Sequence, residues 1–125
     1  MESVIENSGD YIFEDHITEL NFREMEAGQT IGIETLNSSY RFLLIDPANG
    51  KGLLSGGSLG EGRHLAFLTG SIGDKRDPLG IDSRRLRTGA RALFYLETNQ
   101  GTKSLTLSKI VRLFVFEETQ HGFIF

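Results

Sequence analysis

Fifteen glycines and only two prolines divide this chain of 125 residues into short segments, and that spacing constrains the fold more than any other feature. Glycine adopts positive φ at no steric cost, so each glycine marks a place where the chain can turn or bulge. Few of the segments between glycines are long enough to hold a helix of average length. The glycine pattern therefore favours a β-rich protein.

Seven segments between these turns have the apolar patterns of β-strands. Residues 29–34 alternate with period two, which places Ile31 and Ile33 on one face. Residues 40–46 are apolar on both faces, which predicts a strand covered on both sides. The remaining segments are residues 52–57, 64–72, 91–98, 104–108 and 110–116. Strands at this spacing predict an all-β fold, a small antiparallel β-barrel or sandwich of about seven strands.

The clearest turn signal is the sequence DPANG, residues 46–50. Proline fixes φ, and Asn-Gly supplies positions that tolerate the left-handed conformation. We expect Asp46 to cap this turn by accepting backbone N–H bonds, beside Pro47 and Gly50. Gly56 and Gly57 are expected to let the chain bend where the following strand ends. These five positions are interpreted as structural turn residues.

The length fits one domain with a core that needs no disulfide or metal. The absence of cysteine excludes thiolate zinc sites, thiol nucleophiles and disulfides. No apolar run approaches the ~18 residues of a membrane span, and the acidic N-terminus is unlike a secretory signal. We expect a cytoplasmic protein with no membrane association. Residues 1–18 are expected to form an acidic N-terminal arm, extended or with a short helix, and residues 19–125 one β-domain.

The net charge of −4 conceals two segments of opposite charge. Residues 1–34 hold nine acids and a single base, Arg23, which gives a charge of −8. Residues 63–91 hold seven of the thirteen bases and three acids, which gives +4. The separation of the two charged segments, rather than the net charge, indicates which residues are candidates for function.

Three interpretations of this segregation remain open. Arg84, Arg85, Arg87 and Arg91 would bind an anionic ligand or partner, because guanidinium groups pair bidentately with oxyanions. Alternatively, the basic segment is a solvated surface. In the third interpretation the acidic arm folds over the basic segment, in the same chain or a neighbouring copy. A pI near 5.3 disfavours nucleic acid as the partner.

No catalytic or metal motif is complete. The glycine-rich residues 50–62 lack the lysine and the spacing of a P-loop, so these glycines are interpreted as turns and bulges. The three histidines are far apart in the sequence and lack paired ligands, so no metal or cofactor is expected. Ser58 and His64 lie near each other without a nucleophile-elbow motif, which leaves a small hydrolase as a minor alternative to a protein without enzymatic activity.

Two resemblances to known families follow from short motifs. Arg87 and Arg91 match the Arg-x-x-x-Arg form of PilZ domains, small barrels that bind a cyclic dinucleotide, but the Asp/Asn-x-Ser-x-x-Gly motif of those domains is absent after Arg91. Residues 37–58 resemble a group of short bacterial β-rich proteins with the pattern Asn-Ser-x-Tyr, Asp-Pro and Gly-Gly. The resemblance extends over about residues 20–116 and departs at residues 108–110. It implies a strand-turn-strand unit and, since that group has no assigned activity, no function.

The sequence thus predicts a protein-interaction or oligomerising module whose partner is another protein or a second copy. The alternative is a binder of an anionic ligand, a nucleotide, polyanion or nucleic acid, through the segment from Arg84 to Arg91.

Overall fold

The computed structural model describes residues 17–73 and 80–117 of the chain. Within these ranges the structure consists of strands and short 3₁₀-helices, without an α-helix, which confirms the all-β prediction. In chain order the elements are β1 (Glu19–Asn21), η1 (Phe22–Glu24), β2 (Gln29–Thr35), β3 (Ser39–Asp46), η2 (Pro47–Asn49), β4 (Lys51–Gly56), η3 (Gly57–Leu59), β5 (His64–Ile72), β6 (Ile81–Asp82), β7 (Arg85–Arg87), β8 (Arg91–Thr98) and β9 (Gly101–Glu117).

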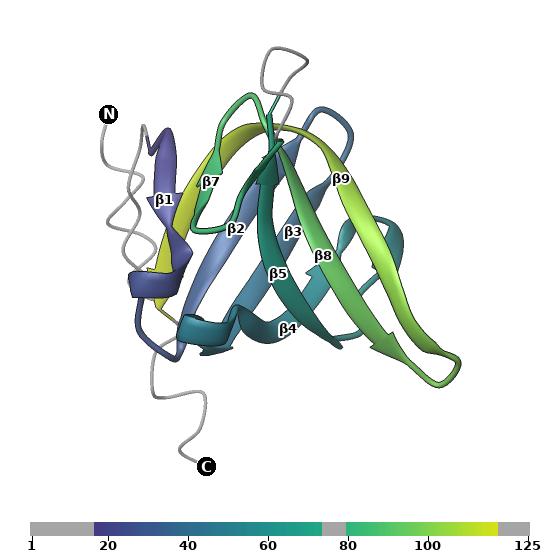
Figure 1. The fold of residues 1–125 in the computed structure, drawn as a ribbon. Coiled ribbons are helices and arrows are strands. Elements are labelled where there is room, and N and C mark those ends of the chain that lie inside the picture. Colours follow the sequence, from purple (N-terminus) through teal and green to yellow (C-terminus); the bar gives the residue numbers. More distant parts are fainter. Residues whose placement is uncertain (1–16, 74–79, 118–125) are drawn as a thin grey trace, which may run out of the picture.

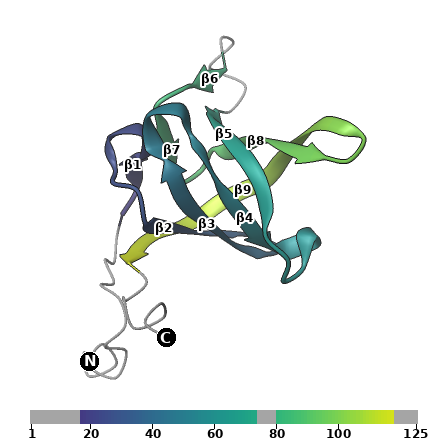
Figure 2. The ribbon, with the colours of Figure 1, turned by 90° about the horizontal axis from the view of Figure 1, so that it is seen from below.

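Six antiparallel strands pair in a closed ring (Figures 1 and 2). Their order is β4-β3-β2-β9-β8-β5, and a further pairing of β4 with β5 closes the ring. β6 pairs with the end of β5 on the edge that also binds β4, while β1 and β7 form a separate two-stranded sheet beside the ring. The strand pairing is thus continuous around the ring, as in a barrel. The separate β1–β7 sheet gives the fold a sandwich-like character.

A single long strand, β9, joins the two halves of the ring. Its first part pairs with β8, and its second part pairs with β2 from Ile110 onward. The register shifts in both ladders, between Arg91 and Leu93 on β8 and between Glu34 and Thr35 on β2. Such bulges bend a strand and increase its twist, and Figure 1 shows β9 arching over the top of the ring. The prediction of two strands, 104–108 and 110–116, was wrong because the chain continues as one strand through these bulges.

The hydrophobic core fills the inside of the ring. Phe42 of β3 and Phe94 of β8 meet edge to face near its centre, with ring centroids 5.0 Å apart and ring planes at 72°. This arrangement suits the charge distribution of two aromatic rings. The core residues are Phe22, Ile31, Ile33, Tyr40, Phe42, Leu44, Leu54, Ala66, Leu68, Leu86, Ala92, Phe94, Leu96, Leu107, Ile110 and Leu113.

The small sheet is held to the ring by apolar contacts and by one arginine. Leu20 lies opposite Leu86 in the β1–β7 register, and Leu86 is fully buried. Arg23 donates from Nε to the carbonyl of Ser83 (2.6 Å) and from Nη1 to that of Ala48 (2.8 Å). Arg23 therefore joins η1 to two other segments.

The N-terminal arm predicted for residues 1–18 is described only at its last two residues. Ile17 forms an isolated bridge with Leu113 of β9, and the Thr18 carbonyl accepts a hydrogen bond from the Thr88 amide (3.0 Å). Residues 1–16, with the short helix considered for them, lie outside the described residues.

The turn at residues 46–50 fastens β4 to its neighbours. Pro47–Asn49 forms η2, and Gly50 follows with φ 71°. The Gly50 amide donates to Pro47 (2.9 Å), and its carbonyl accepts from the Leu68 amide of β5 (2.7 Å). Asp46 does not cap the turn through backbone N–H groups as expected. Its carboxylate instead accepts from the Asn49 side-chain amide at 2.7 Å.

The chain bends again at Gly56 and Gly57, where β4 ends and η3 begins. Their φ angles are 103° and 52°, and both lie in the region that favours glycine. A Cβ at Gly57 would overlap the ring of Tyr40, so the tyrosine occupies the space above the turn.

Candidate functional site

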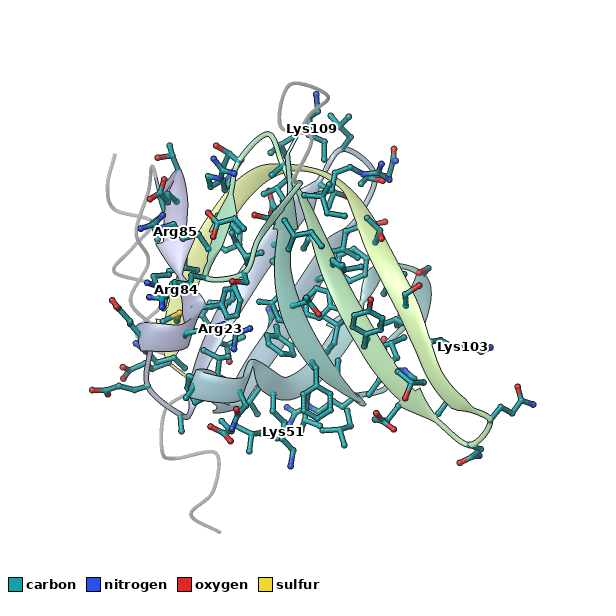
Figure 3. All side chains as sticks on the ribbon, viewed as in Figure 1. Arg23, Lys51, Arg84, Arg85, Lys103 and Lys109 are labelled. Atoms are coloured by element: carbon teal, nitrogen blue, oxygen red, sulfur yellow. The ribbon has the colours of Figure 1, made fainter. Side chains whose placement is uncertain are left out.

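The structure distributes the four arginines of the predicted anionic site over two strands and the segment before them. Arg84 precedes β7, Arg85 and Arg87 lie on β7, and Arg91 begins β8. Figure 3 shows Arg84 and Arg85 near Arg23, on the side of the molecule occupied by β1 and β7. Each of the four guanidinium groups has a different set of partners.

Arg85 is paired with acids of the same chain. Its Nε lies 3.3 Å from the Glu19 carboxylate, and its Nη1 lies 3.9 Å from that of Asp82. Both Arg85 and Glu19 are about half exposed, so this ion pair contributes little to stability. The ion pair joins the two segments of opposite charge, because Glu19 belongs to the acidic residues 1–34 and Arg85 to the basic residues 63–91. At this point one residue from each charged segment meets within one chain, whereas the position of the acidic arm relative to the basic segment stays a prediction.

The other three arginines have no ion pair among the described residues. Arg84 is exposed, and its hydrogen bonds are made by the backbone. Its amide donates to the carboxylate of Asp82 (3.1 Å), and its carbonyl accepts from the backbone amide of Phe22 (3.2 Å). Arg91 donates from Nε to the carbonyl of Leu107 (3.0 Å). Arg87 has its Nε buried without a hydrogen-bond partner. Arg87 is thus the arginine of this segment whose donor is left unsatisfied.

The described residues contain no metal-binding cluster, and the serine and histidine considered for a hydrolase are not hydrogen-bonded to each other. No hydrogen bond joins Ser58 of η3 to His64 at the start of β5. Residues 17–73 and 80–117 contain no group of three His, Asp or Glu side chains placed to hold a metal ion. Over the same ranges the structure has no helix long and apolar enough to cross a membrane.

A candidate surface that the sequence did not reveal lies on the outside of the ring. Leu43 of β3 lies opposite Leu53 of β4, and Leu53 lies opposite Leu65 of β5. The residues beside them on each strand, such as Leu54 and Ala66, are fully buried in the core. Since successive side chains of a strand point to opposite faces, the three leucines point outward in one row. All three are partly exposed.

A second row of apolar side chains continues this surface. Phe67 of β5 is partly exposed and lies opposite Tyr95 of β8, while Ile45 follows Leu43 on β3. Ile45 is 43% exposed and Tyr95 38%, so no described element covers them. We call this surface the outer leucine face; it consists of Leu43, Ile45, Leu53, Leu65, Phe67 and Tyr95. The expectation that residues 40–46 are covered on both sides is wrong for the described part of the chain.

Comparisons with models of known protein families, with curated proteins and with solved structures find no match to this chain.

Proposed function

We propose that the protein is an oligomerising module in which two copies pack through the outer leucine face. The observation that carries this proposal is the register, which places Leu53 of β4 between Leu43 and Leu65 in one row. The inside of the ring is already filled by its own core, so these outward side chains add nothing to it. Their removal from water by a partner would be favourable in proportion to the apolar area buried.

The arrangement of the face suits a second copy of the same chain. A twofold axis along β4 would place Leu53 against Leu53 of the copy and Leu43 against Leu65. The same axis would place Ile45 against Phe67, so most of the apolar groups meet apolar groups, while Lys51 of β4, which lies opposite Phe67, would lie beside Lys51 of the copy at the end of the contact. Interfaces of this isologous kind are the commonest in soluble oligomers, and sheets pack face to face at about 10 Å. The chemical symmetry of the face about β4 is the argument for self-association.

Replacing Leu53 with glutamate is expected to dissociate the dimer. A carboxylate on the twofold axis would face its own copy without a partner, and burying an unpaired charge is strongly unfavourable. We expect the dissociation constant from sedimentation equilibrium to rise about 100-fold or more, because the loss of about 3 kcal/mol corresponds to that factor. Asn99→Glu adds the same charge at the exposed hairpin loop and should leave the mass unchanged. A wild-type chain that remains monomeric at high concentration, or an unchanged Leu53→Glu dimer, would contradict the proposal.

Binding of an anionic ligand is the second candidate function, and the observation that favours it is the unpaired Nε of Arg87. An unsatisfied buried donor costs about 1–3 kcal/mol, more when charged, and an oxyanion would satisfy it. We expect phosphate, a mononucleotide or heparin to raise the melting temperature of the wild-type chain and of Arg85→Gln, but not of Arg87→Gln. Arg85 is the matched control because its charge is already paired. An equal rise in all three proteins would rule out Arg87 as the binding residue.

A further inference from the structure

The first half of β9 has an open edge. From Gly101 to Lys109 this strand pairs with β8 alone, because β2 joins β9 only from Ile110 onward. Figures 1 and 2 both show the β8–β9 hairpin projecting away from the ring. The side chains of Thr102, Ser104 and Thr106 are exposed along it. An edge of this kind presents backbone groups that another extended chain can bond.

The register identifies which backbone groups face this edge. The hairpin has a two-residue loop, Asn99–Gln100, because Thr98 and Gly101 are paired. In such a hairpin the pair beside the loop is hydrogen-bonded, and bonded and non-bonded pairs then alternate along the ladder. The N–H and C=O groups of Thr102, Ser104 and Thr106 therefore point away from β8. These six groups form a regular row along the open edge.

The cations of this edge have no acidic partner among the described residues. Lys103 and Lys109 are exposed on β9, and Figure 3 shows them at well-separated points of the β8–β9 side. Neither forms an ion pair with a described carboxylate. Arg91 of β8 lies opposite Lys109 in the register, and like charges placed so destabilise a sheet. A negatively charged neighbour would remove this repulsion.

We propose that the open edge of β9 binds an acidic, extended segment of another protein as an added strand. The backbone groups of Thr102, Ser104 and Thr106 would supply the affinity, and Arg91, Lys103 and Lys109 would select for acids. The same edge of a second copy is disfavoured as the occupant because it would bring two sets of these cations together. The edge adjoins the outer leucine face at Tyr95, which lies opposite Ser104, but it binds through backbone groups of β9 rather than through the leucine row, so the proposal stands apart from the dimer.

A pair of synthetic peptides tests the charge preference. The probe is a capped heptapeptide of alternating threonine and valine with a glutamate at each end; the control has a lysine at each end. NMR titration of the ¹⁵N-labelled full chain should show the glutamate peptide binding at least about tenfold more tightly. The largest amide shifts should fall on Thr102, Ser104 and Thr106. Equal affinity for the two peptides, or shifts centred elsewhere, would overturn the proposal.

Matched variants test the backbone contribution and the charges separately. Ser104→Pro removes one N–H from the open edge, which proline tolerates where the N–H faces solvent, and should weaken binding about tenfold or more. Ser104→Ala removes only the hydroxyl and should bind like the wild type. Lys103→Glu should weaken binding of the glutamate peptide, whereas Lys51→Glu on β4 should not. If Ser104→Pro fails to fold, the comparison of Lys103→Glu with Lys51→Glu still tests the proposal. Equal peptide affinities for these two variants would overturn it.

Two outcomes separate this proposal from the proposed function. Leu53→Glu should bind the glutamate peptide as the wild type does, so a failure of the dimer leaves the strand-addition test intact. Concentration-dependent association of the wild-type chain that Ser104→Pro abolishes would show that a second copy occupies the edge, and would overturn the proposal of a foreign segment.

Discussion

Replacing Phe42 with alanine is expected to lower the free energy of unfolding by about 4 kcal/mol. The side chain of Phe42 is fully buried inside the ring, and its ring packs against that of Phe94. Alanine would remove this apolar area and leave a cavity that strands bonded on both sides cannot close. Urea denaturation followed by circular dichroism measures the loss as a lower midpoint at an unchanged slope.

Two controls isolate the cavity as the cause. Phe42→Leu keeps most of the apolar volume and should cost at most about 1.5 kcal/mol. Tyr95→Ala removes an aromatic ring from the exposed outer side of the same ring of strands and should cost clearly less than Phe42→Ala. A cost below about 2 kcal/mol for Phe42→Ala would mean that the core relaxes around the missing ring.

Gly50→Ala has the second largest expected effect, a loss of about 3 kcal/mol. Gly50 lies at φ 71°, where a side chain costs about 1–2 kcal/mol. A Cβ there would also overlap the backbone carbonyl of Leu68, the residue whose amide donates to Gly50. The substitution therefore strains the turn and disturbs the junction of β4 with β5, where the ring closes.

Gly89→Ala is the matched control for this substitution. Gly89 also has a positive φ, 89°, in the turn closed by the hydrogen bond from the Ala90 amide to the Arg87 carbonyl, but nothing lies within 4 Å of its added Cβ. Only the conformational cost applies, so we expect a loss of about 1–2 kcal/mol. Thermal unfolding of the two variants compares them directly. Equal losses would mean that the close approach to Leu68 has no energetic weight.

The sequence predicted the elements whose side chains alternate over a sufficient length. Residues 29–34, 40–46, 64–72 and 91–98 each carry five or more residues of strand pattern, and each lies within a strand. Strands β1, β6 and β7 have only two or three residues, too few for a period to be recognised. The sequence of β9 predicts two strands because its bulges interrupt the apolar alternation near Lys109, although the backbone continues as one strand.

The candidate surfaces depend on pairings that local sequence does not encode. Leu43, Leu53 and Leu65 form a row only because three strands pair in one register, and Leu65 lies far from Leu43 along the chain. The double-sided apolar pattern of residues 40–46 is a signal of this surface, but the same pattern is also typical of a strand buried on both faces. Similarly, β9 has an open edge only because β2 ends at Thr35. The arginines are evident in the sequence, whereas their partners, such as Glu19 for Arg85, follow from the β1–β7 pairing.

Oxidative cross-linking of a single cysteine tests the proposed dimer most directly, because the natural chain contains no cysteine. Leu53→Cys would place two thiols opposite each other across the twofold axis, and a small approach of the two sheets would bring their Cβ atoms to the separation of about 3.5–4.5 Å that a disulfide requires. We predict that Leu53→Cys forms a disulfide-linked dimer rapidly at micromolar concentration, while Asn99→Cys at the hairpin loop remains largely monomeric. Equal and slow cross-linking of the two variants would contradict self-association through the outer leucine face.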